Sequence, residues 1–301
     1  MNRNLSHDVS RSVPRFLMCR PQHFAVAYSI NPWMDPRSWA SEDHKLSIES
    51  HKQWTRLHRA LIRLGAQVEF VTAAPGLPDL VFTANAAVVL DGTALLGRFR
   101  HGERQGEEPH YETAFRWLQA HGHVEALRKL PADVTLEGAG DCVFDATRRM
   151  FWMGYGPRSD AAAREPVADL FGVDTLALEL VDPRFYHMDT ALVPLTGGEV
   201  MLVPQAFSPE GRSAIYDRVE PDKRIELAME DGVRLAANAV CVGNTIVLSD
   251  CSAGLRARLS ERGYTVVATP LDSFLRSGGS AFCLTLRLDR KTATLRTDNA
   301  A

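Results

Sequence analysis

Five short apolar runs in this chain of 301 residues each begin beside one polar residue, and the five runs are nearly evenly spaced. The polar residues, called here the five repeat positions, are Asn85, Asp141, Asp189, Asn238 and Cys283. Successive repeat positions are 56, 48, 49 and 45 residues apart in the numbering. A period of about 50 residues predicts a repeated supersecondary unit rather than one continuous sheet. If the units surround a common axis, the repeat positions converge there and place a cysteine at the centre.

The same order of elements recurs between the repeat positions: a hairpin, a helix and a strand. Hairpins are expected around Asp91-Gly92, at 140–156 and at 190–204, with helices over about 110–121, from about 159 and over 252–262. The first strand is expected at 16–20, followed by a helix over 42–64 that Ser41 caps.

No linker rich in Pro, Gly or Ser divides the chain. We therefore expect one α/β domain over residues 1–301, with flexible termini at 1–15 and 290–301.

Charge and cysteine content narrow the class of partner. The net charge of −3 and the scattered basic residues argue against nucleic acid. The five cysteines form no CxxC pair and no zinc pattern with histidine, so we expect no metal and free thiols in a reducing compartment. No apolar stretch is long enough to cross a bilayer and no secretory leader is evident. These features indicate a soluble cytoplasmic protein with a small-molecule substrate, and they leave the oligomeric state, homo-oligomers included, open.

The strongest candidate nucleophile is Cys283, which follows Gly278-Gly279 and is expected to begin an apolar strand. Glycines allow a tight turn and close ligand approach, so this thiol is expected to be partly exposed at a pocket mouth. Lone cysteines are more often structural. His187 could activate the thiol or protonate a leaving group, and Asp189, two residues on, would share its face on a strand.

Acidic and basic side chains near the hairpins suggest a site for a charged ligand. Glu137 and Asp141 bracket a glycine-rich bend and could grip a planar cation such as a guanidinium. Arg104 and Arg158 each follow a hairpin, where two arginines could bind a carboxylate. The simpler alternative for all four is a solvated surface charge.

Together these segments resemble the guanidino-modifying superfamily with the pentein fold, which includes arginine deiminases, dimethylarginine dimethylaminohydrolases, amidinotransferases and arginine dihydrolases. The resemblance runs from about residue 16 to 288. The matching segments are INPWM (30–34), LPDLVFTANA (77–86), RFRHGERQGEEPH (98–110), LEGAGD (136–141), DPRFYHMDT (182–190), AVCVGNTIVL (239–248) and GGSAFCLTLRL (278–288).

The resemblance implies a fold and a role for each matching residue. It implies five ββαβ-like units around a pseudo-fivefold axis, a central site, and no metal or organic cofactor. Cys283 would be the nucleophile and His187 the general acid and base. The substrate-binding residues implied are Glu137 and Asp189 for the guanidinium, Arg104 and Arg158 for the α-carboxylate, Asn31 in a covering loop, and Asp141 in support of Glu137. Asn238 has no implied role.

One departure bears on the reaction. Asn85 stands where deiminases and dimethylargininases of this superfamily typically have aspartate, and the resemblance is closest to arginine dihydrolases, which have asparagine. A carboxamide can donate a hydrogen bond to a neutral ureido carbonyl, which a carboxylate cannot. The implied reaction is therefore two hydrolyses of arginine, to ornithine, carbon dioxide and ammonia. The alternatives are hydrolysis of dimethylarginine, amidino transfer to an amine, and a non-catalytic pentein module.

Overall fold

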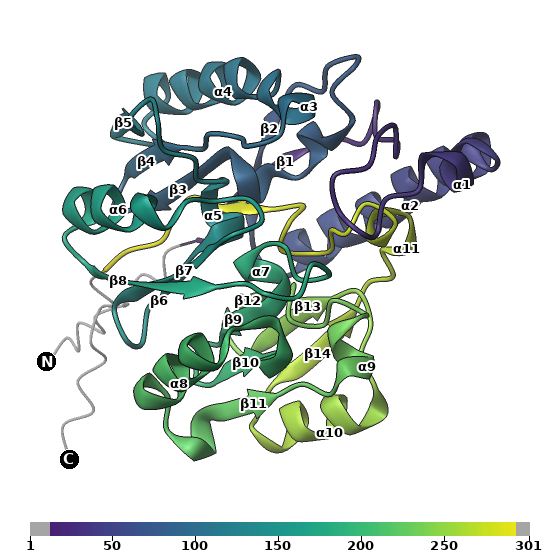
Figure 1. The fold of residues 1–301 in the computed structure, drawn as a ribbon. Coiled ribbons are helices and arrows are strands. Elements are labelled where there is room, and N and C mark those ends of the chain that lie inside the picture. Colours follow the sequence, from purple (N-terminus) through teal and green to yellow (C-terminus); the bar gives the residue numbers. More distant parts are fainter. Residues whose placement is uncertain (1–12, 293–301) are drawn as a thin grey trace, which may run out of the picture.

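Five three-stranded sheets make up the fold of residues 13–292, as the repeat predicts. The computed structural model of the chain describes residues 13–292, so the predicted flexible termini lie outside the described residues except at 13–15 and 290–292. Helices α2, α4, α6, α8 and α10 lie on the outside, and the short helices α5 and α7 lie among the sheets (Figure 1). None of the described helices combines the length and hydropathy needed to cross a membrane.

Four sheets are built from a continuous stretch of chain. Each begins with an antiparallel hairpin, continues through a helix, and ends with a strand parallel to the second hairpin strand. The hairpins are β3–β4 (Ala87–Leu90, Thr93–Leu96), β6–β7 (Cys142–Asp145, Met150–Tyr155), β9–β10 (Leu192–Pro194, Val200–Leu202) and β12–β13 (Val240–Val242, Thr245–Leu248). The helices are α4 (Glu108–Ala120), α6 (Arg164–Phe171), α8 (Pro209–Arg218) and α10 (Ala253–Glu261), and the returning strands are β5 (Ala126–Lys129), β8 (Asp174–Glu179), β11 (Arg224–Glu226) and β14 (Thr265–Ala268).

The fifth sheet joins the two ends of the described chain. Strand β15 (Leu286–Arg287) pairs antiparallel with β1 (Arg15–Cys19), and β1 pairs parallel with β2 (Gln67–Val71) across helix α2 (Asp43–Arg63). β15 and β1 thus take the places of the two hairpin strands. This pairing completes the fifth unit with segments from opposite ends of the sequence.

A short helical segment lies at or just before the first strand of several units. Helix α5 (Gly138–Asp141) leads into β6 and helix α7 (Met188–Ala191) leads into β9, while a 3₁₀ turn (Thr83–Ala86) leads into β3. Three repeat positions lie in these segments, so their side chains leave the backbone on a helical turn rather than on a strand. Cys283 likewise lies in a turn before β15, and the prediction that it begins a strand is wrong.

The helix expected over 42–64 is present as α2, but the prediction that Ser41 caps it is wrong. Glu42 occupies the N-cap position without a side-chain cap bond. Ser41 instead ends a preceding short helix, α1 (Pro36–Ala40), in which Asp35 accepts hydrogen bonds from the Arg37 and Ser38 backbone amides. The Asp35 cap therefore starts a separate short helix before the one that the apolar spacing indicates.

The apolar core lies between the sheets and the outer helices. Its largest cluster joins residues from β6 to β14, among them the fully buried Trp152. A second cluster packs α1 and α2 against the segment around Cys283. Burial of this kind provides the main favourable free energy of folding and fixes the segments that carry the repeat positions.

Strand β1 offers a test of the fifth sheet. Leu17 is fully buried and pairs with Leu286 of β15 and with Glu69 of β2. We expect Leu17→Ala to lower the free energy of unfolding by about 2–5 kcal/mol, because the change leaves a cavity in the core. Val13→Ala, at a half-exposed position just before β1, should change it by less than about 0.5 kcal/mol. Denaturant unfolding measures both free energies. Equal effects of the two substitutions would contradict the conclusion that burial of β1 stabilises the fold.

Candidate active site

A closed ring of five hydrogen bonds joins the segments that carry the repeat positions. The links are Asn85 Nδ2 to the Glu137 carbonyl (2.9 Å), Met188 N to Asp141 Oδ1 (3.0 Å), Asn238 Nδ2 to the Asp189 carbonyl (3.2 Å), Cys283 N to Asn238 Oδ1 (3.1 Å) and Ala84 N to the Cys283 carbonyl (3.1 Å). Glu137 belongs to the same short segment as Asp141. We call these links the hydrogen-bond ring. All five repeat positions are buried, so the convergence expected from the period is present.

The Cys283 thiol lies between a carboxylate and a carboxamide. Its Sγ is 3.2 Å from Asp189 Oδ2, to which it donates, and 3.0 Å from Asn238 Nδ2, from which it accepts. Only 2% of the residue is exposed, so the prediction of a partly exposed thiol at a pocket mouth is wrong. The turn before β15 points the side chain inward toward the ring.

Burial and the neighbouring Asp189 raise the pKa of the Cys283 thiol well above its usual value. Burial also raises the pKa of Asp189 to about 7, although the hydrogen bond from Cys283 opposes this shift. The thiol is therefore protonated in the free site at neutral pH, and Asp189 exchanges a proton near that pH. Such shifted groups clustered in one place are typical of a functional site.

Glu137 is the charged centre of the site. Its Oε2 accepts from Arg158 Nη1 at 3.0 Å and contacts His187 Nε2 at 2.8 Å, with Arg104 Nη1 at 4.0 Å. Burial alone would raise its pKa, but Arg158, His187 and Arg104 hold the pKa of Glu137 well below the usual range. The carboxylate is therefore ionised and already bound to a guanidinium group.

His187 meets Glu137, not Asp189. The prediction that His187 and Asp189 share a strand face is wrong, because His187 is the N-cap of α7 and Asp189 lies within that helix. Burial lowers the pKa of His187 to about 4, against the opposing hydrogen bond to Glu137. The His187 imidazole is thus neutral at pH 7. Because ionised Glu137 can only accept a hydrogen bond, Nε2 of His187 carries the proton. Nδ1 is left as the basic nitrogen.

Asn85 lies between Glu137 and Arg104. Its Nδ2 donates to the Glu137 carbonyl and its Oδ1 accepts from Arg104 Nη1 at 2.9 Å. Arg104 also donates to both carboxylate oxygens of Glu107, at 2.9 and 2.8 Å. Both arginines predicted for the site are therefore buried beside it rather than placed on the surface.

Asp141 lies beside Glu137, with its Oδ2 at 3.9 Å from His187 Nε2. Its two oxygens accept from the Met188 amide and from Ser159 Oγ at 2.6 Å. The glycines of the EGAGD bend are needed for close approach. A Cβ on Gly138, where φ is +60°, would lie 2.6 Å from the Asn85 carbonyl, and one on Gly140 would lie 2.3 Å from Asn85 Nδ2.

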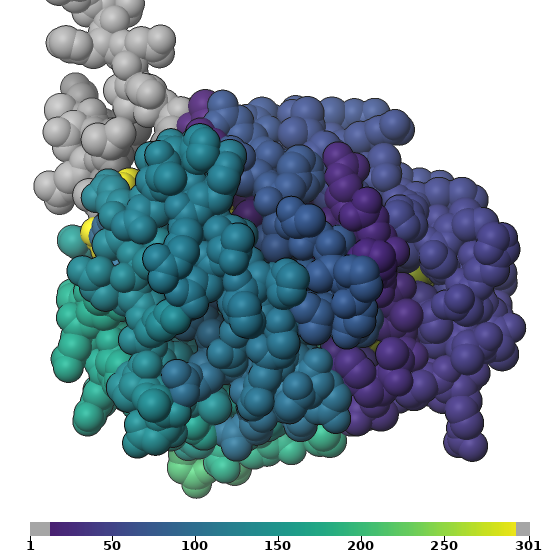
Figure 2. Space-filling model, turned by 90° about the horizontal axis from the view of Figure 1, so that it is seen from above, coloured from purple at the N-terminus to yellow at the C-terminus, as the bar shows by residue number. Residues whose placement is uncertain are grey.

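The loop between β1 and α1 covers the site through Asn31. Asn31 Nδ2 donates to the Ser277 carbonyl at 3.1 Å, and Arg158 Nη2 donates to the Ile30 carbonyl at 3.3 Å. Figure 2 shows this purple segment lying on the surface, with only small areas of the yellow C-terminal part visible beside it. The loop therefore ties the glycine-rich turn before Cys283 to Arg158.

Three side chains in the site had no role in the prediction from sequence. Asn238 contacts Cys283, Ser159 holds Asp141, and Tyr186 Oη donates to the Gly278 carbonyl at 2.9 Å with its ring 4.6 Å from the Arg158 guanidinium. The period marks Asn238, and Ser159 and Tyr186 directly follow or precede predicted residues. Only the three-dimensional arrangement shows what they contact.

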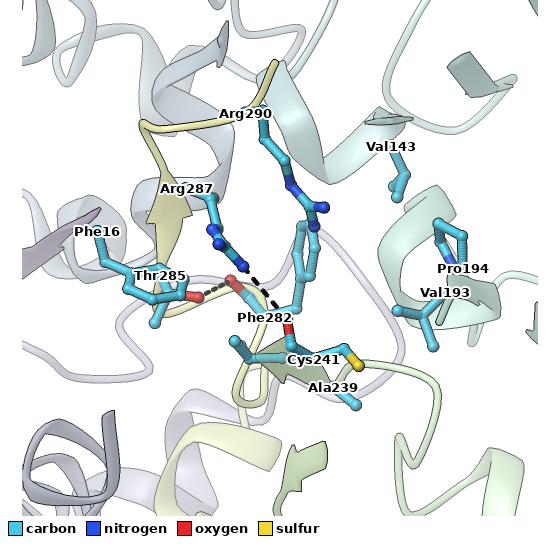
Figure 3. Close-up of a pocket in the computed structure, with 11 residues that line it drawn as sticks. Phe16, Val143, Val193, Pro194, Ala239, Cys241, Phe282, Thr285, Arg287 and Arg290 are labelled. Carbon is cyan, nitrogen blue, oxygen red and sulfur yellow. Dashed lines mark hydrogen bonds between the residues drawn. The ribbon is translucent and has the colours of Figure 1, made fainter. Parts of the chain in front are cut away.

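A separate small cavity lies further along the inner strands (Figure 3). Val143, Val193 and Cys241 line it, together with Arg287, which donates to the Cys241 carbonyl at 3.3 Å. None of the repeat positions lines this cavity. Within residues 13–292, no three His, Cys, Asp or Glu side chains are grouped as metal ligands.

The chain is similar to known proteins over nearly its whole length. A family model described as "N,N dimethylarginine dimethylhydrolase, eukaryotic" matches residues 20–290. The chain is 37% identical over 277 residues to N(G),N(G)-dimethylarginine dimethylaminohydrolase of Mycobacterium tuberculosis, which covers 91% of this chain and 85% of that protein.

Arginine dihydrolases are similar as well. The chain is 42% identical over 275 residues to the bifunctional arginine dihydrolase/ornithine cyclodeaminase ArgZ of Synechocystis, covering 91% of this chain and 37% of that protein. It thus spans less than two fifths of the length of such bifunctional relatives. The crystal structure of the ArgZ N-terminal domain, a cysteine-to-serine mutant bound to substrate, superposes with a TM-score of 0.86 at 39% identity, covering 93% of this chain and 100% of that domain.

The raised pKa of Asp189 predicts a distinct pH dependence of stability. A carboxyl whose folded pKa is about 7 stabilises the fold below its ordinary pKa of 3.8, and this contribution is lost as pH rises toward 7. We expect Asp189→Asn to gain up to about 4 kcal/mol in unfolding free energy relative to the unchanged protein between pH 4 and 8. Denaturant unfolding at both pH values measures the gain.

Asp174→Asn is the matched control, because Asp174 is exposed and paired with Arg218. It should show no such gain with rising pH. A stability difference for Asp189→Asn that stays flat or falls over this range would contradict the assignment of a raised pKa.

Proposed function

Since this chain belongs to the dimethylarginine dimethylhydrolase family of guanidino-modifying enzymes, we propose that it hydrolyses the guanidino group of free arginine through Cys283. The proposed reaction has two rounds and yields ornithine, carbon dioxide and two molecules of ammonia from arginine and two of water. The observation that carries the proposal is the contact between buried, ionised Glu137 and a guanidinium group, close to a buried thiol site.

Glu137 and Asp189 are the proposed guanidinium ligands. The Arg158 guanidinium on Glu137 supports this role, since a substrate guanidinium makes the same charge-assisted hydrogen bond. Asp189 Oδ1 is buried and has no hydrogen-bond partner within the described residues, while Oδ2 accepts from Cys283. A buried oxygen without a donor is costly, so a substrate N–H would satisfy it.

Arg104 and Arg158 are the proposed ligands of the substrate α-carboxylate. Both are buried within reach of Glu137, and both have more donors than the contacts described above use. When the substrate guanidinium binds Glu137, it takes over the charge pairing that Arg158 supplies in the free site. Arg158 then becomes available to a carboxylate, with Asn31 and its loop covering the complex.

The proposed chemistry begins with the thiol proton. Binding of a cation next to Cys283 lowers the pKa of the thiol, and the Nδ1 of neutral His187 accepts the proton. The thiolate adds to the guanidinium carbon, and protonated His187 gives its proton to the departing ammonia. A covalent amidino-thioether remains on Cys283. His187 then removes a proton from water, which attacks the same carbon and releases a ureido product.

Asn85 is the proposed reason that hydrolysis continues to a second round. Its Nδ2 has two hydrogens, one of which is donated to the Glu137 carbonyl. The other is available to the oxygen of a bound ureido group, which is neutral and accepts. The thiolate can then attack the ureido carbon and release the second ammonia, which leaves a thiocarbamate between Cys283 and the ornithine nitrogen. Water breaks its C–S bond, and the resulting carbamate loses carbon dioxide to give ornithine.

Hydrolysis of dimethylarginine to citrulline and dimethylamine is the second candidate. The family model and the mycobacterial relative favour it. The two candidates share Cys283, Glu137 and His187 and differ in the leaving group.

We further propose a cytoplasmic location, since all five cysteines lie in the described residues and are free, as reducing conditions keep them. A homo-oligomeric assembly also stays a proposal.

Product analysis of purified protein tests the proposal. With arginine we expect ornithine and two ammonia per turnover, and with dimethylarginine slower release of dimethylamine. Cys283→Ala should reduce turnover by at least about a thousandfold, because removing a nucleophile leaves only substrate positioning, whereas Cys251→Ala, at another buried free thiol, should keep it. Faster dimethylamine release would favour the second candidate. Neither product, or unchanged turnover in Cys283→Ala, would reject the assigned chemistry.

Asn85→Asp tests the second round. The carboxylate cannot donate to a ureido oxygen but still pairs with Arg104, so we expect citrulline to become the main product with one ammonia per turnover. Chromatographic quantification of citrulline and ornithine measures the change. Asn244→Asp, the same substitution in the exposed β12–β13 turn, should leave the product ratio unchanged. Continued release of ornithine by Asn85→Asp would show that the Asn85 amide is not needed for the second hydrolysis of the ureido intermediate.

A further inference from the structure

Asn238 makes three hydrogen bonds around Cys283 with its side chain. Its Oδ1 accepts from the Cys283 backbone amide at 3.1 Å, and its Nδ2 donates to Cys283 Sγ at 3.0 Å and to the Asp189 carbonyl at 3.2 Å. Its own carbonyl also accepts from the Phe282 amide at 3.3 Å. The side chain is fully buried. One side-chain amide thus forms hydrogen bonds with both the backbone and the sulfur of the candidate nucleophile.

These partners fix which end of the amide faces the sulfur. A backbone N–H can only donate and a backbone carbonyl can only accept, so Oδ1 must face Cys283 N and Nδ2 must face the Asp189 carbonyl. The second hydrogen on Nδ2 then points at Sγ. The sulfur therefore acts as an acceptor toward Asn238 and as a donor toward Asp189.

The two neighbours of the sulfur favour opposite protonation states. Asp189 accepts the S–H and favours the thiol, whereas a donor to the sulfur favours the thiolate. The Ser280 backbone amide is a second donor to the sulfur. The Asn238 donor belongs to a side chain, so a substitution can remove it without changing the backbone. Its effect on the thiolate can therefore be measured separately.

We propose that Asn238 is a positioning residue that holds Cys283 in line with the substrate carbon and stabilises the thiolate form of its sulfur. The inference rests on the proposed function, in which Cys283 is the nucleophile. The sulfur is the attacking group when ammonia leaves and the departing group when water attacks. The same N–H therefore raises the fraction of thiolate available for the attack and stabilises the negative charge that returns to the sulfur when it departs.

Alkylation by iodoacetamide separates this role from a merely structural one, because its rate follows the fraction of thiolate. Asn238→Asp keeps the shape of the side chain and removes the donor, and Asn238→Ala removes both contacts. We expect alkylation of Cys283, located by peptide mass spectrometry between pH 7 and 9, to slow about 10- to 100-fold in both variants, the usual value of a hydrogen bond to a charged group. A loss of packing alone would open the site and speed alkylation.

Activity with arginine gives a second measurement. The variants should lower kcat by about 10- to 100-fold at neutral pH, recover part of the loss as pH rises, and change KM little. Asn244→Asp adds the same charge in an exposed turn and should change neither alkylation nor kcat. Circular dichroism establishes that each variant is folded, and Asn238→Ala replaces Asn238→Asp if the latter does not fold.

The outcomes distinguish the inference from the function on which it rests. Unchanged or faster alkylation of Cys283 in folded variants overturns the inference even if arginine is hydrolysed. Slower alkylation in a protein that does not hydrolyse arginine supports the role of Asn238 and rejects the proposed substrate. A fall in kcat that is independent of pH, together with an unchanged rate of alkylation, would show that Asn238 has only a structural role.

Discussion

The hydrogen-bond ring is the interaction on which the rest of the site depends. Its five links join segments that lie about 50 residues apart in sequence, and each link uses a side-chain or backbone group at a repeat position. The sheets alone would leave these segments as separate turns at the inner ends of five units. Buried polar groups need hydrogen-bond partners, so the turns can pack together only if each donor on one turn meets an acceptor on the next. The same requirement brings Glu137, Asp189 and Cys283 into one place.

Burial gives the site a mostly neutral resting state. Of the ionisable groups around the thiol, Glu137 is held ionised by Arg158 and Arg104, whereas Cys283 is protonated, His187 is neutral and Asp189 titrates near neutral pH. A site of this kind is stable without substrate because few charges are left unpaired. In the proposed reaction a cationic substrate changes this balance, since it pairs with the carboxylates and favours the thiolate.

The repeat and most of the candidate site residues could be predicted from the sequence. The contacts that each of these residues makes could not. The period near 50 residues and the turn signals predicted the units, and the resemblance predicted residues that the structure brings together around Glu137. The spacing of two residues suggested a strand at 187–189, and the apolar run suggested another at Cys283. The chain instead makes a short helix at the first place and a turn at the second. On such a turn His187 reaches the next segment rather than Asp189, and Cys283 turns inward to become buried. The role of Asn238 depends on contacts with a segment 45 residues away and has no local signal.

The covalent intermediate is the most direct test of the account. Rapid acid quenching of the protein during turnover with arginine, followed by peptide mass spectrometry, should show an adduct on the peptide that contains Cys283. Its added mass should be that of arginine less ammonia or citrulline less ammonia, and the adduct should disappear as arginine is exhausted. Turnover without any adduct, or an adduct confined to another cysteine, would contradict the assignment of this site.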